Sequence, residues 1–187
     1  MTPYSLDTLT DITTSRLTLR LMDPMVVEAC LDSDIATGSL RLGALIPDEL
    51  LDHPSSLMYS VRRLQADPGY LPWAARAIIL TDENLMIGII RFHSCPGPEY
   101  LLPYAEGAVE IGYRVFSDHR KQGFATEALN GLMEWAREKF NVQKFVLAIS
   151  PANTPSLRLA KRFGFMKVGE EMDDIDGIEY VFLLDRG

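Results

Sequence analysis

The chain of 187 residues contains only two cysteines and three histidines. Cys30 and Cys95 lie far apart in the sequence, so they form neither a CxxC redox pair nor a thiolate zinc site. The histidines, His53, His93 and His119, show no metal-ligand spacing. We therefore expect no bound metal ion.

Long apolar runs are also missing. The longest runs, such as Met86–Ile90, are far too short to span a membrane, and Met1–Asp11 lacks the basic and apolar segments of a secretion signal. Basic residues are outnumbered, with 18 Lys and Arg against 26 Asp and Glu, so nucleic acid is not expected as the main partner. The composition favours a soluble cytoplasmic protein. A net charge of -8 would suit a cationic substrate such as an amine, but solubility explains it equally well.

An apolar fraction of 47% with 24% charged residues is ordinary for a globular protein, and the length suits one domain over residues 1–187. Apolar periodicity and turn signals predict an α/β fold with a mixed sheet. The expected strands cover residues 16–22, 73–80, 84–92, 108–116, 144–150, 165–168 and 180–184. The expected helices cover residues 24–34, 47–66 with an interruption at His53–Pro54, 122–140 and 154–163. Residues 38–45 stay unassigned.

The most informative stretch is His119–Ala128, a basic, glycine-containing turn between a strand and an amphipathic helix. The strand over residues 108–116, the helix and the strand over residues 144–150 should form a parallel crossover. A turn that opens a helix leaves several backbone N–H groups without intrahelical acceptors at the positive end of the helix dipole. Such a turn favours an anion, above all a phosphate.

The residues of this turn carry a family resemblance. Arg120-x-x-Gly123-x-Ala125 resembles the Q/R-x-x-G-x-G/A phosphate-binding signature of the GNAT superfamily, the acyl-CoA-dependent N-acetyltransferases. The run Gly123–Ala128 is similar to the GYATEA form found in the branch that acetylates ribosomal-protein N-termini, and Ser15–Arg20 resembles the start of that branch. The strand over residues 109–113 precedes the signature in the expected order.

A second cofactor motif lies downstream, where Asn153-x-x-Ser156 is followed by Lys161–Phe165. With this motif the specific matches cover about residues 108–168. The resemblance implies the GNAT fold, with six to seven strands in a mostly antiparallel sheet, about four helices and a central parallel strand pair. It also implies acetyl-CoA as co-substrate. The residues expected to bind it are Tyr113, Arg114, Val115, Arg120, Lys121, Gln122, Gly123, Phe124, Ala125, Thr126, Asn153 and Ser156.

The implied reaction transfers an acetyl group from the thioester to a primary amine, on a protein N-terminus or a small molecule. The amine must first lose a proton, and Glu110 is the first candidate for the base, acting through a water. A structural salt bridge is nearly as good an explanation of Glu110. Glu99, Glu106 and His93 are reserve bases. The resemblance places the oxyanion donor on the backbone near residues 113–115.

The general acid departs from one common family pattern. Many relatives carry a tyrosine at the position of Ala160, which cannot donate a proton. In the N-terminal-acetylating branch a serine stands earlier, and Ser156 matches it, so Ser156 is the candidate acid. Asn153 would contact the pantetheine arm. Helix capping is the alternative role for both residues.

Other functional classes fit this sequence to different degrees. An acyl-CoA-binding regulatory module without turnover is possible if Glu110 and Ser156 are both structural. A dinucleotide-binding dehydrogenase and a P-loop enzyme are disfavoured because their glycine-rich signatures are absent from the sequence. A thiol enzyme that uses Cys95 with His93 is a remote alternative. A monomer and a homodimer are both compatible with the sequence.

Overall fold

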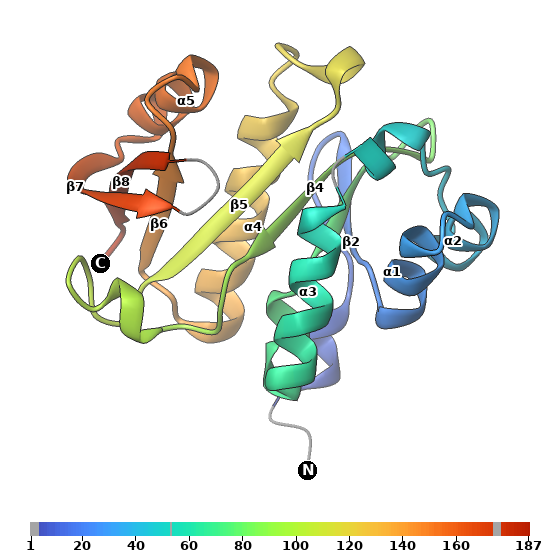
Figure 1. Ribbon diagram of the computed structural model, residues 1–187, viewed down its shortest axis with the longest axis horizontal. Helices are drawn as coiled ribbons and strands as arrows, with labels where there is room; N and C mark the ends of the chain where they lie inside the picture. Colours follow the sequence, from blue (N-terminus) through green and yellow to red (C-terminus); the bar gives the residue numbers. More distant parts are fainter. Residues whose placement is uncertain (1–3, 53, 174–176) are drawn as a thin grey trace. The chain divides into compact units, whose positions relative to one another are not determined.

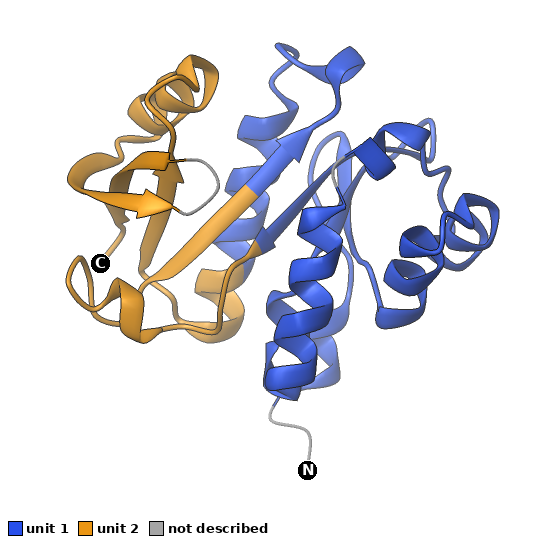
Figure 2. Ribbon diagram, viewed as in Figure 1, with its two compact units in different colours: residues 1–91, 113–135 blue, residues 92–112, 136–187 orange. Residues whose placement is uncertain are grey.

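The computed structural model describes residues 4–52, 54–173 and 177–187 (Figure 1). These residues form an α/β fold with eight strands and five α-helices, which confirms the predicted class. The chain divides into two compact units, which Figure 2 shows in different colours. Unit 1 comprises residues 1–91 and 113–135, and unit 2 comprises residues 92–112 and 136–187. Strand β5 (Val109–Val115) and helix α4 (Phe124–Phe140) contribute residues to both units.

Unit 1 contains an antiparallel sheet in the order β1 to β4. Its strands are β1 (Ile12–Thr13), β2 (Leu17–Leu21), β3 (Arg76–Leu80) and β4 (Leu85–Phe92), whose last residue enters unit 2. The strands predicted over residues 73–80 and 84–92 are present as β3 and β4, and they form an antiparallel hairpin with Arg76 paired to Ile90. Both strands are buried along most of their length, as their nearly continuous apolar sequence predicts for strands covered on both faces.

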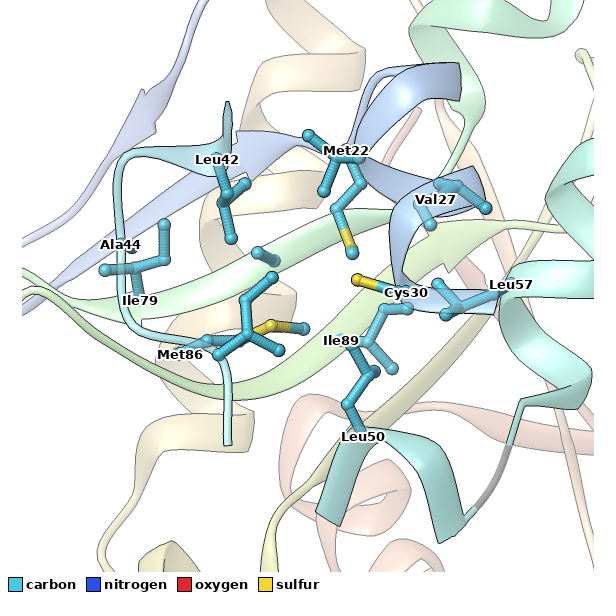
Figure 3. Packing of buried hydrophobic residues seen from close by; sticks show 14 of the residues in the cluster. Met22, Val27, Cys30, Leu42, Ala44, Leu50, Leu57, Ile79, Met86 and Ile89 are labelled. Atoms are coloured by element: carbon cyan, nitrogen blue, oxygen red, sulfur yellow. The ribbon is translucent and has the colours of Figure 1, made fainter. Parts of the chain in front are cut away.

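Helices cover one side of this sheet in unit 1. They are α1 (Pro24–Leu31), α2 (Ile35–Leu42) and α3 (Ser55–Ala66), with 3₁₀ turns at Leu6–Leu9, Asp48–Asp52 and Pro68–Trp73. Figure 3 shows the core that they share with the sheet, where Cys30 lies next to Ile89, and Val27, Leu57 and Ile79 belong to the same buried cluster. Each such side chain contributes roughly 1.5–3 kcal/mol through its removal from water.

The helix predicted over residues 24–34 is present but ends earlier, and a second helix follows it. Helix α1 ends at Leu31, and Ser33 takes a left-handed backbone conformation with φ of 61°. Asp34 then caps α2, because its side chain accepts a hydrogen bond from the N–H of Thr37 at 3.0 Å. Ile35 therefore belongs to α2, which covers most of the stretch that the sequence left unassigned. The predicted break near Pro54 is confirmed, and His53 lies outside the described residues.

Unit 2 contains the first part of β5, residues 109–112, together with the elements between residues 144 and 185. Its further elements are β6 (Lys144–Ile149), α5 (Thr154–Phe163), β7 (Met166–Asp173) and β8 (Gly177–Asp185). Strands β5 and β6 are parallel, with Val109 paired to Phe145, and this confirms the predicted parallel pair. Strand β8 then pairs antiparallel with both β6 and β7.

The strand predicted over residues 165–168 is longer in the structure, and the acidic residues expected to form a turn before the next predicted strand, at residues 180–184, belong largely to strands. Strand β7 continues to Asp173, with Glu170 paired to Tyr180. Strand β7 is the last strand in the pairing order, and most of its residues are exposed. Charged residues are common on such edge strands, so the usual apolar alternation was absent.

The long segment over residues 94–107 is anchored to unit 2. Leu101, Ala105 and Ala108 are buried in a cluster with Val146 and Val181. The ring of Tyr104 lies against Gly169, where any side chain on that glycine would overlap the ring. The segment is therefore an ordered part of unit 2, with its own 3₁₀ turn at residues 99–101.

Candidate active site

The basic turn lies in unit 1 between the end of β5 and the start of α4. After a short 3₁₀ turn at Ser117–His119, the backbone of Arg120 is extended, with φ of -72° and ψ of 160°. Lys121 and Gly123 then both have positive φ angles, of 61° and 86°. Among the described residues, no backbone carbonyl accepts a hydrogen bond from the N–H groups of residues 121–126. These N–H groups, at the helix N-terminus, are a suitable donor set for phosphate oxygens.

Lys121 takes a conformation that normally belongs to glycine. Left-handed φ angles cost a non-glycine residue roughly 1–2 kcal/mol, because Cβ approaches the following carbonyl oxygen. The GNAT signature that this turn resembles often has glycine at the position of Lys121. The structure explains the family preference, since this position requires a positive φ angle whichever residue occupies it.

The side chain of Arg120 contacts two other residues of unit 1, Val115 and Glu49. Its Nε donates a hydrogen bond to the Val115 carbonyl at 2.9 Å, which ties the turn to the end of β5. Its Nη2 lies 3.9 Å from Oε1 of Glu49, and the Arg120 side chain is 56% exposed. Glu49 also accepts hydrogen bonds from the backbone N–H and the hydroxyl of Ser117. Sequence reasoning missed Glu49, because nothing local connects residue 49 with residue 117.

The first turn of α4 is held by Glu127. Its carboxylate accepts hydrogen bonds from Thr14 at 2.6 Å and from the backbone N–H of Arg16 at 2.8 Å. The Arg16 guanidinium forms an ion pair with Glu127 at 2.7 Å and lies 4.4 Å from the centroid of the Phe124 ring. Burial raises the pKa of Glu127, but these hydrogen bonds outweigh that effect and leave the pKa lowered. Glu127 therefore connects the start of α4 to the segment Thr14–Arg16.

Strand β4 approaches β5 closely within unit 1. The Phe116 N–H donates to the Ile87 carbonyl at 2.8 Å, and a side chain at Gly88 would overlap the Arg114 carbonyl oxygen. Tyr113 and Arg114 are half-buried and Val115 is buried. The backbone near residues 113–115, expected to supply the oxyanion donor, therefore lies against β4.

Glu110 and His93 meet in unit 2. The backbone N–H of His93 donates to the Glu110 carbonyl at 2.9 Å, and His93 Nδ1 lies 3.1 Å from Glu110 Oε1. The Glu110 side chain is 11% exposed and the imidazole is 27% exposed. The imidazole also lies over Gly112, where a Cβ would come within 2.5 Å of Nε2. Glu110, the first candidate for the base, and His93, a reserve base, thus form one pair.

The other reserve groups of this segment differ from His93. Glu99 and Glu106 are exposed. Strand β4 ends at Phe92, so His93 and Cys95 are not the alternate residues of one strand. His93, by contrast, contacts the Glu110 carboxylate.

Asn153 and Ser156 lie at the start of α5, also in unit 2. Asn153 is the N-cap, because its Oδ1 accepts a hydrogen bond from the backbone N–H of Ser156 at 3.2 Å. Thr154 is the first helical residue, and Pro155 follows it. Ser156 is half-buried, and Ala160 is completely buried. The capping alternative considered for Asn153 is therefore present in the structure.

Comparisons with known proteins decide the family. The sequence profile of the Acetyltransferase (GNAT) domain matches residues 16–166, which is most of the chain and includes parts of both units. The chain belongs to the GNAT acetyltransferase family. It is an acyltransferase by this membership, as the sequence resemblance predicted.

Relatives with curated names agree with this family. The chain is 28% identical over 92 residues to the uncharacterized N-acetyltransferase YnaD of Bacillus subtilis, and the match covers 49% of each chain. It is 26% identical over 159 residues to the uncharacterized N-acetyltransferase YoaA of the same species, covering 83% of this chain and 82% of YoaA. The chain thus spans about half the length of the first of these GNAT relatives and most of the second.

The fold is also that of solved GNAT proteins. A ribosomal-protein-S5-alanine acetyltransferase from Vibrio fischeri superposes with a TM-score of 0.61 at 17% identity, covering 95% of this chain and 97% of that one. At this identity the likeness concerns the fold alone. None of the described helices of the GNAT chain combines the length and apolar character that crossing a bilayer requires.

Proposed function

We propose that this GNAT protein transfers an acetyl group from acetyl-CoA to a primary amine, as one catalytic domain over residues 1–187. The observation that carries the proposal is the turn at residues 120–125, where two positive φ angles precede the N-terminus of α4. Its backbone N–H groups bind the pyrophosphate, and Arg120 and Lys121 add positive charge. The family match across residues 16–166 supports this assignment.

The base is the pair of His93 and Glu110. Only the free amine attacks a thioester, so the ammonium form of the acceptor must lose a proton. A neutral imidazole whose Nδ1–H donates to Glu110 presents Nε2 as the proton acceptor. The nearly buried carboxylate then orients the ring and stabilises the imidazolium that forms. This assignment refines the earlier prediction, in which Glu110 took the proton through a water.

Ser156 is the proposed hydrogen-bond donor to the leaving thiolate. It lies in the first helical turn of α5, and its backbone N–H is already bound to Asn153. The family resemblance supports the donor role, since the position of the usual tyrosine is the completely buried Ala160. Backbone N–H groups near residues 113–115 stabilise the oxyanion.

The acceptor is a protein N-terminus or a small-molecule amine. The ribosomal-protein acetyltransferase among the similar structures supports the first class. Cofactor motifs persist while acceptor loops vary, so the family alone does not choose between them.

Two measurements test this function. Isothermal titration should show acetyl-CoA binding with a Kd on the order of micromolar, and the Gly123→Val variant should lose it while keeping its circular dichroism spectrum. Release of free thiol should then be followed over a panel of amines and short peptides. Tight acetyl-CoA binding with no thiol release from any acceptor would support a binding module without turnover. Absence of acetyl-CoA binding would overturn the proposal.

A further inference from the structure

A contact between two distant segments of unit 1 fixes the chain just before the turn at residues 120–125. The backbone N–H of Ser117 donates to both carboxylate oxygens of Glu49, at 2.9 and 3.1 Å, and the Ser117 hydroxyl donates to Oε2 at 2.8 Å. The N-cap of the 3₁₀ turn at residues 117–119 is Phe116, whose buried ring offers no hydrogen-bond acceptor. Glu49 therefore supplies the capping acceptor that the local sequence lacks.

The segment that carries Glu49 is itself held in place within unit 1. Ile46 and Leu50, on either side of Glu49 in the sequence, are 2% and 3% exposed and belong to the same buried cluster as Phe116. Leu45 forms two backbone hydrogen bonds, each of 2.9 Å, with the hairpin of β3 and β4. The Glu49 carboxylate thus extends from a fixed backbone, so little further ordering is needed for its contact with the turn.

The guanidinium of Arg120 is oriented, but its outer edge is not used. Its Nε donates to the Val115 carbonyl at 2.9 Å, which fixes one side of the plane. Its Nη2 lies 3.9 Å from Glu49 Oε1, a distance at which opposite charges attract without a hydrogen bond. Within the part of the chain that the structure describes, neither Nη group has a hydrogen-bond acceptor. Both Nη groups are therefore available for phosphate oxygens.

We propose that Glu49 is a positioning residue for the pyrophosphate of acetyl-CoA, acting through Ser117 and Arg120. Its carboxylate fixes the start of the turn, so the backbone N–H groups of residues 121–126 keep their orientation before the ligand arrives. It also holds the Arg120 guanidinium beside these donors. Preorganised donors bind an anion more tightly, because less conformational entropy is lost on binding. This role rests on the acetyltransferase function proposed above.

The charge of Glu49 by itself would have the opposite effect. A carboxylate repels a nearby pyrophosphate, so its removal should strengthen binding if Glu49 had no positioning role. Asp48 is the matched control, because it is the exposed neighbour on the same 3₁₀ turn and its substitution removes the same charge. The direction of the change in affinity therefore separates positioning from charge.

The first arm of the test measures order in the turn without any ligand. In the ¹⁵N-labelled full-length chain, the Ser117 amide should exchange with solvent about five- to tenfold faster in Glu49→Ala than in the parent, because one capping acceptor is lost. The NMR order parameters of residues 117–123 should fall as well. Asp48→Ala should change neither quantity. Unchanged Ser117 exchange in Glu49→Ala would overturn the proposal.

The second arm measures coenzyme binding and turnover. Glu49→Ala should raise the Kd of acetyl-CoA about five- to tenfold by calorimetry, and Asp48→Ala should leave it unchanged or lower it. With acetyl-CoA as donor, the KM of the coenzyme should rise while kcat and the KM of the amine stay the same.

A donor without the pyrophosphate gives the sharpest control. S-acetylpantetheine carries the same thioester but no phosphate, so its kcat/KM should be equal in Glu49→Ala and the parent. A loss of the same size with this donor would overturn the positioning role. So would a Kd of acetyl-CoA in Glu49→Ala that is equal to or below that of the parent.

The route through Arg120 is tested by a double-mutant cycle. Residues that act through one another show losses that do not add, so Glu49→Ala should cost less acetyl-CoA affinity in an Arg120→Met background than in the parent. Fully additive losses would overturn the part assigned to Arg120.

Should Glu49→Ala unfold, Glu49→Gln keeps a carbonyl acceptor for Ser117 and removes only the charge. It should show Ser117 exchange close to that of the parent and a Kd about twofold above that of Asp48→Asn, the size expected for an exposed ion pair. A Kd equal to that of Asp48→Asn would overturn the hold on Arg120. A parent chain that binds no acetyl-CoA would overturn the proposed function together with this role. Equal acetyl-CoA binding by the parent and Glu49→Ala would overturn the role of Glu49 alone.

Discussion

His93 Nδ1 lies 3.1 Å from Glu110 Oε1, and the His93 backbone N–H donates to the carbonyl of the same glutamate at 2.9 Å. Two independent contacts therefore fix this imidazole relative to β5. A ring held at one nitrogen by a nearly buried carboxylate has a defined tautomer and orientation. This relationship is the basis of the first two predictions.

Removal of either member of the pair should lower turnover without loss of acetyl-CoA binding. We expect His93→Gln to lower kcat/KM by about 10²- to 10⁴-fold, the usual contribution of a general base, and Glu110→Gln to lower it less. The loss should be greatest at low pH, where deprotonation of the amine limits the rate. The double variant should be hardly worse than His93→Gln, since the residues act as a unit. Glu106→Gln is the control, and additive losses in the pH-rate profiles would contradict the pairing.

Gly112→Ala should displace the imidazole. A Cβ at this position would come within 2.5 Å of His93 Nε2, so the ring must move away. We expect a fall in kcat approaching that of His93→Gln, with acetyl-CoA affinity unchanged by calorimetry. If kcat were normal in a folded Gly112→Ala protein, the observed ring position would have no role in catalysis.

Lys121→Gly should separate backbone strain from charge in the turn. Glycine accepts φ of 61° without the Cβ clash, so we expect a stability equal to the parent or higher by up to about 1 kcal/mol. Acetyl-CoA affinity should nevertheless fall several-fold, because one positive charge is lost. Lys121→Ala is the matched control, with the same charge loss and the strain retained. Thermal melts and calorimetry measure the two effects, and a Lys121→Gly protein less stable than Lys121→Ala would refute the strain.

Ser156→Ala should lower turnover with little change in acetyl-CoA affinity or melting temperature. Asn153→Ala should instead destabilise the protein by about 1 kcal/mol, because it removes the side-chain cap of α5. Thiol-release kinetics and thermal melts of the two variants therefore give opposite patterns. A Ser156→Ala protein that only melts earlier would make this serine structural.

Because Glu127 accepts its hydrogen bonds as a carboxylate, the free energy of unfolding should fall at acidic pH. The folded pKa of Glu127 is lowered from its ordinary value of 4.5, so its stabilisation is present above pH 4.5 and is lost as pH falls through the folded pKa. Glu127→Gln should cost about 1 kcal/mol at pH 7, towards the low end for charged hydrogen bonds because Arg16 is half exposed. Urea unfolding at pH 7 and pH 3 measures it. A difference from the parent that does not decrease between pH 7 and pH 3 would contradict an origin in the charge.

The turn at residues 120–125 could be recognised from the sequence because its determinants are local. A strand, a glycine and an amphipathic helix follow one another within about 30 residues, and backbone N–H groups at a helix start need no distant partner to be suitable for a phosphate. The parallel pair of β5 and β6 followed from the same order of elements. The fold class and the family were predictable for this reason.

The pairings of side chains were decided by the tertiary structure alone. Glu49 meets Ser117, Arg16 meets Glu127, and His93 meets Glu110 through loops and sheet registers that no local pattern encodes. Arg91 of β4 likewise lies over the ring of Tyr59, which belongs to α3. The sequence by itself determined the family and the position of the turn with its backbone donors, since such donors depend on local conformation. Only the fold decided which side chains act together, because such contacts depend on packing between residues distant in the chain.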